Sequence, residues 1–204
     1  MPMNAWITDC LPAVLIALAL AWHVWMLRKS ESVEQLMASR RAWLRKVMGT
    51  PGHELLAVQT VRNSLMAASL MATTAALGVA GALSVGKEAG LLGHALSEGL
   101  MGATAPWVAA KTALLAGALT VAFLVFSLSV RFYHRVGYTL AGLQGEDAAM
   151  IERAASELMR GAGFYRAGWC AFYAALAGAA WFFGTWPMCV VAVLALILDH
   201  KVSE

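Results

Sequence analysis

Long stretches without charged residues alternate with shorter charged segments along this chain. No Lys, Arg, Asp or Glu occurs within 10–27, 63–86, 112–130 or 167–198. A helix needs about 20 predominantly apolar residues to cross the hydrocarbon of a bilayer. The pattern therefore predicts membrane-spanning helices, with one span in each of the first three stretches.

The last stretch, 167–198, is too long for one crossing, because a single helix of that length would measure about 48 Å at 1.5 Å per residue. Gly184 and Pro187 interrupt it, and proline both removes a backbone donor and disfavours helix in the residue before it. We therefore predict a fourth span, a tight outer turn at Gly184–Pro187 and a short fifth span. Trp181 and Trp186 would lie at the outer interface, which amphipathic rings prefer. The alternative is one kinked, tilted helix that leaves the C-terminus outside.

Two charged segments between the spans also have helical periodicity. Segment 30–50 has apolar residues at helical intervals and a basic face. Its basic residues are Arg40, Arg41, Arg45 and Lys46. Because such residues favour anionic headgroups, we expect this amphipathic helix to lie on the membrane. Segment 146–162 predicts a second amphipathic helix, in which Arg153 and Glu157 have the spacing of a surface ion pair.

Taken together, these elements predict an all-α fold, a polytopic membrane helix bundle that forms a single integral membrane domain over 1–204. The predicted spans are 8–27, 62–86, 107–130, 165–183 and 188–202. The two amphipathic helices belong to the predicted cytoplasmic segments 28–61 and 131–164, and the predicted outer loop is 87–106.

The composition agrees with a membrane protein and gives an orientation. The 204 residues are 60% hydrophobic and 13% charged, whereas about a quarter of the residues in soluble domains are charged. Lys and Arg concentrate in 28–61 and 131–164, and by the positive-inside rule these segments face the cytoplasm. We therefore predict a multipass protein of the bacterial inner membrane, with its N-terminus outside and its C-terminus in the cytoplasm. The start lacks a basic n-region, so we expect the first span to be retained.

Small residues recur every four positions along the second span. The row consists of Ser64, Ala68, Ala72, Ala76, Ala80 and Ser84. Apolar contact gives little driving force between helices in lipid, and close packing of small residues takes its place. The row therefore predicts a helix-packing seam.

Polar residues mark the cytoplasmic end of the second span. Gln59, Arg62 and Asn63 fall on one helical face, and residues of other spans are expected at the same depth. The candidate polar cluster consists of Gln59, Arg62, Asn63, Arg131, His134 and His23. One interpretation is that Arg62 only snorkels to lipid headgroups. The other is a functional cluster, because ionisable groups at membrane depth are costly unless they are paired or hydrated.

No residue pattern indicates catalysis or a bound cofactor. His23 and His134 could together ligate a haem or metal, but without a companion cysteine or carboxylate a hydrogen-bonded or interfacial role is favoured. His94 and Glu98, four residues apart, could form a two-ligand metal site, but a solvated loop is favoured there. The cysteines Cys10, Cys170 and Cys189 occur singly, as small buried hydrophobes do. The chain has no P-loop, GxSxG or HExxH motif. We expect no enzymatic activity, no metal, no cofactor and no nucleic-acid binding.

Several segments resemble a known family. They are RRAWL at 40–44, LAVQTVRNSLMAASLMATTA at 56–75, SLSVRF at 127–132, FY at 172–173, WFFG at 181–184 and LD at 198–199. Together they resemble the domain of unknown function 599 family, multipass membrane proteins of plants and bacteria. The resemblance implies the membrane architecture, and it gives weight to the polar cluster around Arg62. It implies no activity, because the family has none established.

Three functions are compatible with these patterns. We expect first a non-catalytic accessory or scaffold subunit, whose partners are membrane lipids, including anionic ones, and further membrane subunits or copies of itself. It predicts a dry bundle with no continuous polar path. The alternative is a small transporter or channel for an anionic solute or lipid headgroup, although Lys111, one of its candidate cations, is expected to snorkel at the outer interface. The third is a haem-binding redox subunit.

Overall fold

The structure is a computed structural model that describes residues 31–50, 52–92, 105–142 and 148–203. Within these ranges every regular element is helical, which confirms the all-α prediction. The helices are α2 (Glu31–Met48), α3 (Glu54–Leu92), α4 (Ala105–Ala141), α5 (Ala148–Ala180), η1 (Trp181–Phe183) and α6 (Thr185–Ser203). The predicted first span 8–27 lies outside the described residues, as do His23, Cys10 and most of the outer loop.

Two helices are long and apolar enough to cross a membrane. They contain Leu55–Lys87 within α3 and Val108–Ala141 within α4, and α6 holds a shorter apolar stretch, Thr185–Leu198. The helices α3 and α4 include the predicted spans 62–86 and 107–130. Their length and composition are consistent with a membrane protein. The number of crossings stays a prediction.

Helix α5 runs without a break through two elements that the sequence suggested were separate, the amphipathic segment 146–162 and the fourth span 165–183. Gly161 and Gly163 lie in its interior and do not end it. At Gly161, a Cβ atom would lie 3.0 Å from the Tyr133 ring, so the absent side chain allows α4 to approach closely. Interhelical packing at such a glycine offsets its weak helix propensity.

The contacts between residues divide the chain into two compact units. Unit 1 comprises the described parts of Ala75–Ala122 and Trp169–Glu204, and unit 2 those of Lys29–Thr74 and Phe123–Gly168. The helices α3, α4 and α5 each contribute to both units. Unit 2 also contains α2, and unit 1 also contains η1 and α6.

The core of unit 2 encloses the apolar face of α2. Leu44, Val47 and Met48 of α2 belong to one buried cluster with residues of the other three helices, among them Val136 of α4 and Leu158 of α5. An apolar stripe is stabilised by burial against neighbouring helices as well as by burial in lipid. Leu44, Val47 and Met48 are thus covered within the chain, whereas Leu36 of the same segment is 45% exposed. The location of segment 30–50 on the membrane stays a prediction.

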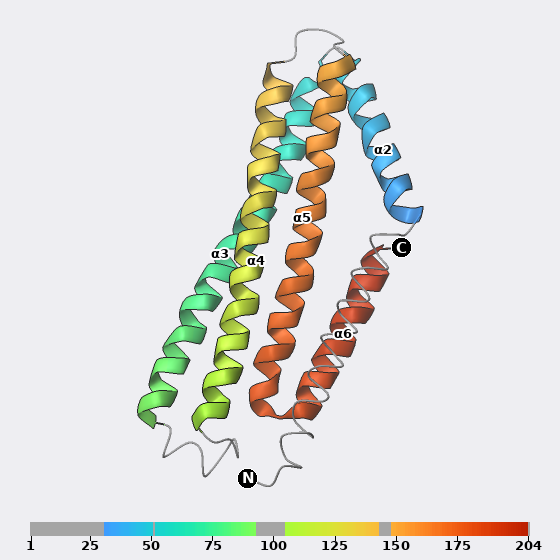
Figure 1. Cartoon of the computed structure of the whole chain (residues 1–204). Helices are drawn as coiled ribbons and strands as arrows, with labels where there is room; N and C mark the ends of the chain where they lie inside the picture. Colours follow the sequence, from blue (N-terminus) through green and yellow to red (C-terminus); the bar gives the residue numbers. More distant parts are fainter. Residues whose placement is uncertain (1–30, 51, 93–104, 143–147, 204) are drawn as a thin grey trace. The chain divides into compact units, whose positions relative to one another are not determined.

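In unit 1, α5 and α6 form an antiparallel hairpin (Figure 1). After η1, Gly184 has a φ of +123° and leads directly into α6, whose first turn tolerates Pro187 because the amides there have no intrahelical acceptor. A turn therefore occurs at Gly184 as predicted, but it consists of Trp181–Gly184, and Pro187 lies within α6. Two helices form here in place of the single kinked helix of the alternative. Trp186 is 78% exposed, whereas Trp181 is only 6% exposed and packs in the hairpin with Met188.

Candidate functional site

The polar stripe of α3 lies on the outside of unit 2. Gln59, Arg62 and Asn63 are exposed, whereas Ala57 and Val61 of the same helix belong to the core. At 100° per residue the stripe falls opposite those core positions. The three side chains therefore point away from the interior of the unit.

The candidate residues of α4 are exposed as well. Arg131 and His134 face away from the core that buries Tyr133. The His134 ring stacks on Tyr138 of its own helix, with 6.5 Å between ring centres. Within the described ranges, no hydrogen bond or ion pair joins these two side chains to the α3 stripe. The structure thus places five of the six candidates on the surface of one unit, three on α3 and two on α4, and the sixth, His23, lies outside the described residues.

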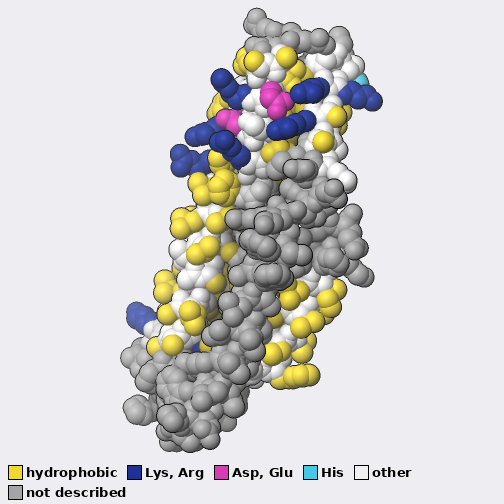
Figure 2. All heavy atoms as spheres, turned by 45° about the vertical axis from the view of Figure 1, so that its right-hand side comes forward, with side chains coloured by type: hydrophobic (Ala, Val, Ile, Leu, Met, Phe, Trp, Pro, Cys, Tyr) yellow, Lys and Arg dark blue, Asp and Glu magenta, His cyan; other side chains and the backbone are white. Residues whose placement is uncertain are grey.

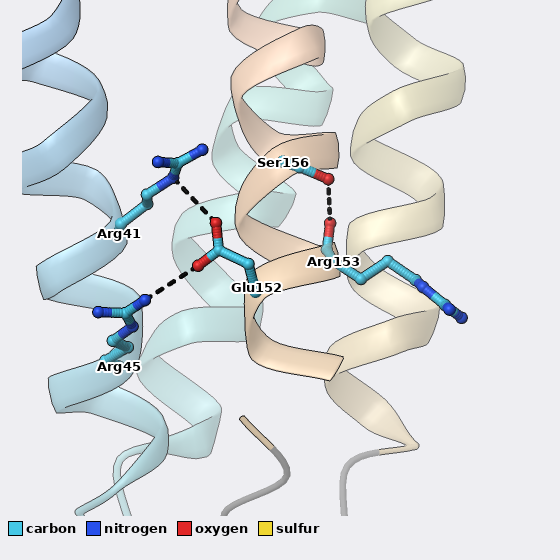
Figure 3. Close-up of polar contacts among 5 residues, drawn as sticks. All are labelled: Arg41, Arg45, Glu152, Arg153 and Ser156. Atoms are coloured by element: carbon cyan, nitrogen blue, oxygen red, sulfur yellow. Dashed lines mark hydrogen bonds and ion pairs between the residues drawn. The ribbon is translucent and has the colours of Figure 1, made fainter. Parts of the chain in front are cut away.

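Figure 2 shows Lys and Arg side chains gathered around a few acidic ones over unit 2. There, the two carboxylate oxygens of Glu152 in α5 each contact one arginine of α2, an arrangement called here the Glu152 fork (Figure 3). The Arg41 Nε atom lies 3.2 Å from Oε1 of Glu152, and the Arg45 Nη2 atom lies 3.0 Å from Oε2. Two cations of α2 therefore hold one carboxylate near the start of α5, and they leave the fork with a net positive charge.

The surface pair predicted between Arg153 and Glu157 is not formed. In Figure 3, Arg153 points away from the fork, and its carbonyl oxygen accepts a hydrogen bond of 2.8 Å from the Ser156 hydroxyl. The Oε2 atom of Glu157 is buried without a hydrogen-bond partner among the described residues. The carboxylate that pairs is Glu152, because it is the one that α5 presents to α2.

Two buried hydroxyl groups are hydrogen-bonded to carbonyl groups of the chain's own helices. In unit 2, Ser129 is fully buried, and its hydroxyl donates to the Gly161 carbonyl oxygen over 2.8 Å. In unit 1, the buried Thr112 hydroxyl donates to the Val108 carbonyl oxygen over 2.9 Å. Burying a polar group without a partner is costly, and these bonds remove that cost.

Lys111 occupies a different place from the one that its sequence position suggested. It is 7% exposed, and its Nζ donates to the Trp181 carbonyl oxygen over 3.2 Å. The same atom lies 4.8 Å from the centre of the Trp181 ring, within the range of a cation–π contact. The acceptor lies just past the end of α5, where the negative end of the helix dipole favours a cation. Lys111 therefore stabilises the hairpin and does not snorkel.

The predicted packing seam of α3 changes face along the helix. Ser64 is half-buried and Ala68 and Ala72 are buried, but Ala76, Ala80 and Ser84 are exposed. Each four-residue step turns the helix by about 400°, so a row of six rotates by about 200° and cannot keep one face. The buried positions of α3 include a row seven residues apart, Val61, Ala68, Ala75 and Ala82, together with Ala57 and Ala72.

No group of three or more His, Cys, Asp or Glu residues able to hold a metal ion occurs among the described residues. Cys170 and Cys189 are half-buried. His134 stacks on Tyr138, and no cluster of metal-ligand side chains surrounds it in the part of the chain that the structure describes.

A comparison with known families decides the relationship. The family described as "Protein of unknown function, DUF599" matches residues 10–202. The chain belongs to the DUF599 family. No curated protein and no solved structure matches it.

In this DUF599 member, the segment 56–75 that most resembles the family has two opposite faces. One face is packed, with Val61 and Ala68 in the core of unit 2. The other carries Gln59, Arg62 and Asn63 into the surroundings. The sequence identified the polar stripe. It gave no sign of the Glu152 fork, because the fork joins helices more than a hundred positions apart, with 107 between Arg45 and Glu152.

Proposed function

We propose that the protein is a non-catalytic integral membrane protein that serves as an accessory or scaffold subunit, assembling with copies of itself or with a larger membrane complex. One observation carries this proposal. Gln59, Arg62 and Asn63 lie on the outside of a closed helical unit, with Val61 of the same helix buried beneath them.

A transport path needs polar groups that line an interior, whereas a protein partner recognises polar groups fixed on a surface. The interior of unit 2 is filled by apolar side chains such as Phe126 and Val136, both fully buried. Its buried Ser129 is engaged with the backbone of α5. Cations held on rigid helices attract a partner that carries acidic groups at matching positions, and they fix the position in which that partner docks. An acidic surface of a second membrane subunit is the partner that this stripe would fit.

The membrane-spanning helices leave room for such assembly. In the most apolar windows of α3 and α4, only 22% of the residues are buried inside the chain. The remaining surface is available to lipid or to the helices of other subunits. In the proposed orientation unit 2 faces the cytoplasm of a bacterial inner membrane, because it carries most of the basic residues.

The test is isolation in native nanodiscs without detergent, followed by mass spectrometry of everything recovered with the chain. The proposal expects a partner, or further copies, at fixed stoichiometry. Arg62→Glu should remove the partner, and Arg153→Glu, an exposed charge reversal on α5, should keep it. Recovery of single chains with no partner would contradict the proposal. Anion flux in liposomes that Arg62→Glu abolishes would establish the transporter alternative instead.

A further inference from the structure

Two phenylalanine rings stack where α4 meets α5 in unit 2. The centres of the Phe132 and Phe164 rings lie 5.4 Å apart, with 13° between the ring planes, and both side chains are half-buried. The helices approach closely at this point, because a Cβ atom on Gly161 would lie 3.3 Å from the Phe132 Cβ atom. The two rings, called here the aromatic pair, therefore form an apolar surface that bridges α4 and α5.

Each of the two helices carries an arginine on the same side of the aromatic pair. Arg135 follows Phe132 by three residues, and Arg160 precedes Phe164 by four, which places the arginines about 4.5 and 6 Å farther along the helix axes. Because α4 and α5 run antiparallel (Figure 1), both displacements have the same direction. Residues three or four apart are also neighbours on a helix surface, so both arginines lie next to the aromatic pair.

The positive charge of these arginines is not neutralised within the described residues. Both side chains are exposed, and in these ranges no ion pair joins either of them to a carboxylate. The Arg135 guanidinium carbon lies 5.5 Å from the centre of the Phe132 ring, a cation–π contact that orients the side chain. Glu157 is one turn from Arg160, but its Oε2 atom is buried without a hydrogen-bond partner among the described residues. Since neighbouring cations repel each other, an anion held by both arginines is favoured.

A phosphate group matches the chemistry of the two arginines, because planar guanidinium groups donate paired hydrogen bonds to phosphate oxygens. The aromatic pair favours a phosphate that is attached to an apolar group. The charge-free stretch of α4 ends at 130 and that of α5 begins at 167, so the pair lies between the arginines and the apolar parts of both helices. A free phosphate would gain nothing from the rings, whereas the acyl chains of a lipid would extend past them.

We propose that Arg135 and Arg160 bind the phosphate of an anionic phospholipid, with an acyl chain against Phe132 and Phe164. The site rests on the integral membrane character of the proposed function and not on its scaffold role, because it lies on α4 and α5, whereas the polar stripe assigned to a partner lies on α3. Phosphatidylglycerol is a suitable probe, since it combines a single negative charge with ordinary acyl chains.

The test is native mass spectrometry of the full chain released from nanodiscs of mixed phosphatidylglycerol and phosphatidylcholine. Wild type should retain phosphatidylglycerol in preference to phosphatidylcholine, and Arg135→Gln and Arg160→Gln should each lower that preference about fivefold. Arg62→Gln is the matched control, because it removes an exposed arginine of α3 and should keep the lipid. Equal preference in wild type and the Arg135→Gln/Arg160→Gln double variant would overturn the proposal, as would an equal loss in Arg62→Gln.

Two further measurements separate the lipid from other anions. Phosphatidylglycerol with a photoreactive acyl chain should label wild-type peptides that contain Phe132 or Phe164, and even labelling along all helices would overturn the proposal. Inorganic phosphate should not be retained from nanodiscs of phosphatidylcholine alone, and retention as strong as that of phosphatidylglycerol would overturn the assignment to a lipid. A double variant that keeps its phosphatidylglycerol but loses a protein partner would overturn it as well, and would assign both arginines to a protein interface.

Discussion

Gly168 of α5 lies so close to Phe126 of α4 that a Cβ atom on the glycine would stand 2.6 Å from Cε1 of the ring. Phe126 is fully buried, and Tyr165 packs edge-on against it with 5.7 Å between ring centres. The ring is therefore fixed from a second side and cannot readily move away. In unit 2 the approach of α4 to α5 depends on the missing side chain at position 168.

Gly168→Ala should destabilise the protein by about 1–3 kcal/mol, the usual cost of overpacking a well-packed core. Gly163→Ala is the control, because its Cβ would meet nothing within 4 Å. That change should stabilise by about 0.5–1 kcal/mol through helix propensity alone. Thermal unfolding in nanodiscs measures both, and a shift of the same sign in the two variants would show that the close contact is not the cause.

Glu152→Gln should loosen α2 from the start of α5, because it removes the charge that Arg41 and Arg45 share. The Glu152 side chain is 43% exposed, so we expect a loss of only about 0–1 kcal/mol, and less at high salt. Hydrogen exchange of the α2 amides at low and high ionic strength measures the effect. Arg153→Gln should leave α2 unchanged. Exchange in Glu152→Gln that equals wild type at low salt would contradict a role for the fork.

Lys111→Ala should destabilise the α5–α6 hairpin by about 1–3 kcal/mol. The substitution removes the hydrogen bond to the Trp181 carbonyl and the cation–π contact. Faster hydrogen exchange around η1 would report it. Lys87→Ala, at an exposed position of α3, should change stability by less than about 0.5 kcal/mol. Equal changes in stability and in hydrogen exchange for Lys111→Ala and Lys87→Ala would show that the buried Lys111 contact does not stabilise the hairpin.

Gly184→Ala should cost about 1–3 kcal/mol, because φ is +123° at this residue and side chains rarely allow that conformation. Pro187→Ala is a nearby control with an ordinary backbone requirement, and it should change stability by less than about 0.5 kcal/mol. Differential scanning calorimetry in nanodiscs compares the two. A neutral Gly184→Ala would mean that the turn can relax to another conformation.

The sequence predicted what depends on local pattern. The charge-free stretches located the apolar parts of α3, α4, α5 and α6, and Gly184 with Pro187 located the hairpin turn, because these signals need only neighbouring residues. The outward stripe at Arg62 followed from helical periodicity in the same way. The side-chain contacts that stabilise the fold did not follow. Lys111 and Trp181 are 70 positions apart, and no spacing rule relates residues that meet only after helices pack.

A row of buried positions in α3 at intervals of seven, Val61, Ala68, Ala75 and Ala82, restricts how the length of this helix can change. One extra residue between them would turn everything after it by about 100°, carrying Ala75 and Ala82 outward and polar neighbours inward. Seven extra residues would return every later side chain to almost its original direction. Insertions in this helix should thus be tolerated in whole heptads, so its length can change only in discrete steps.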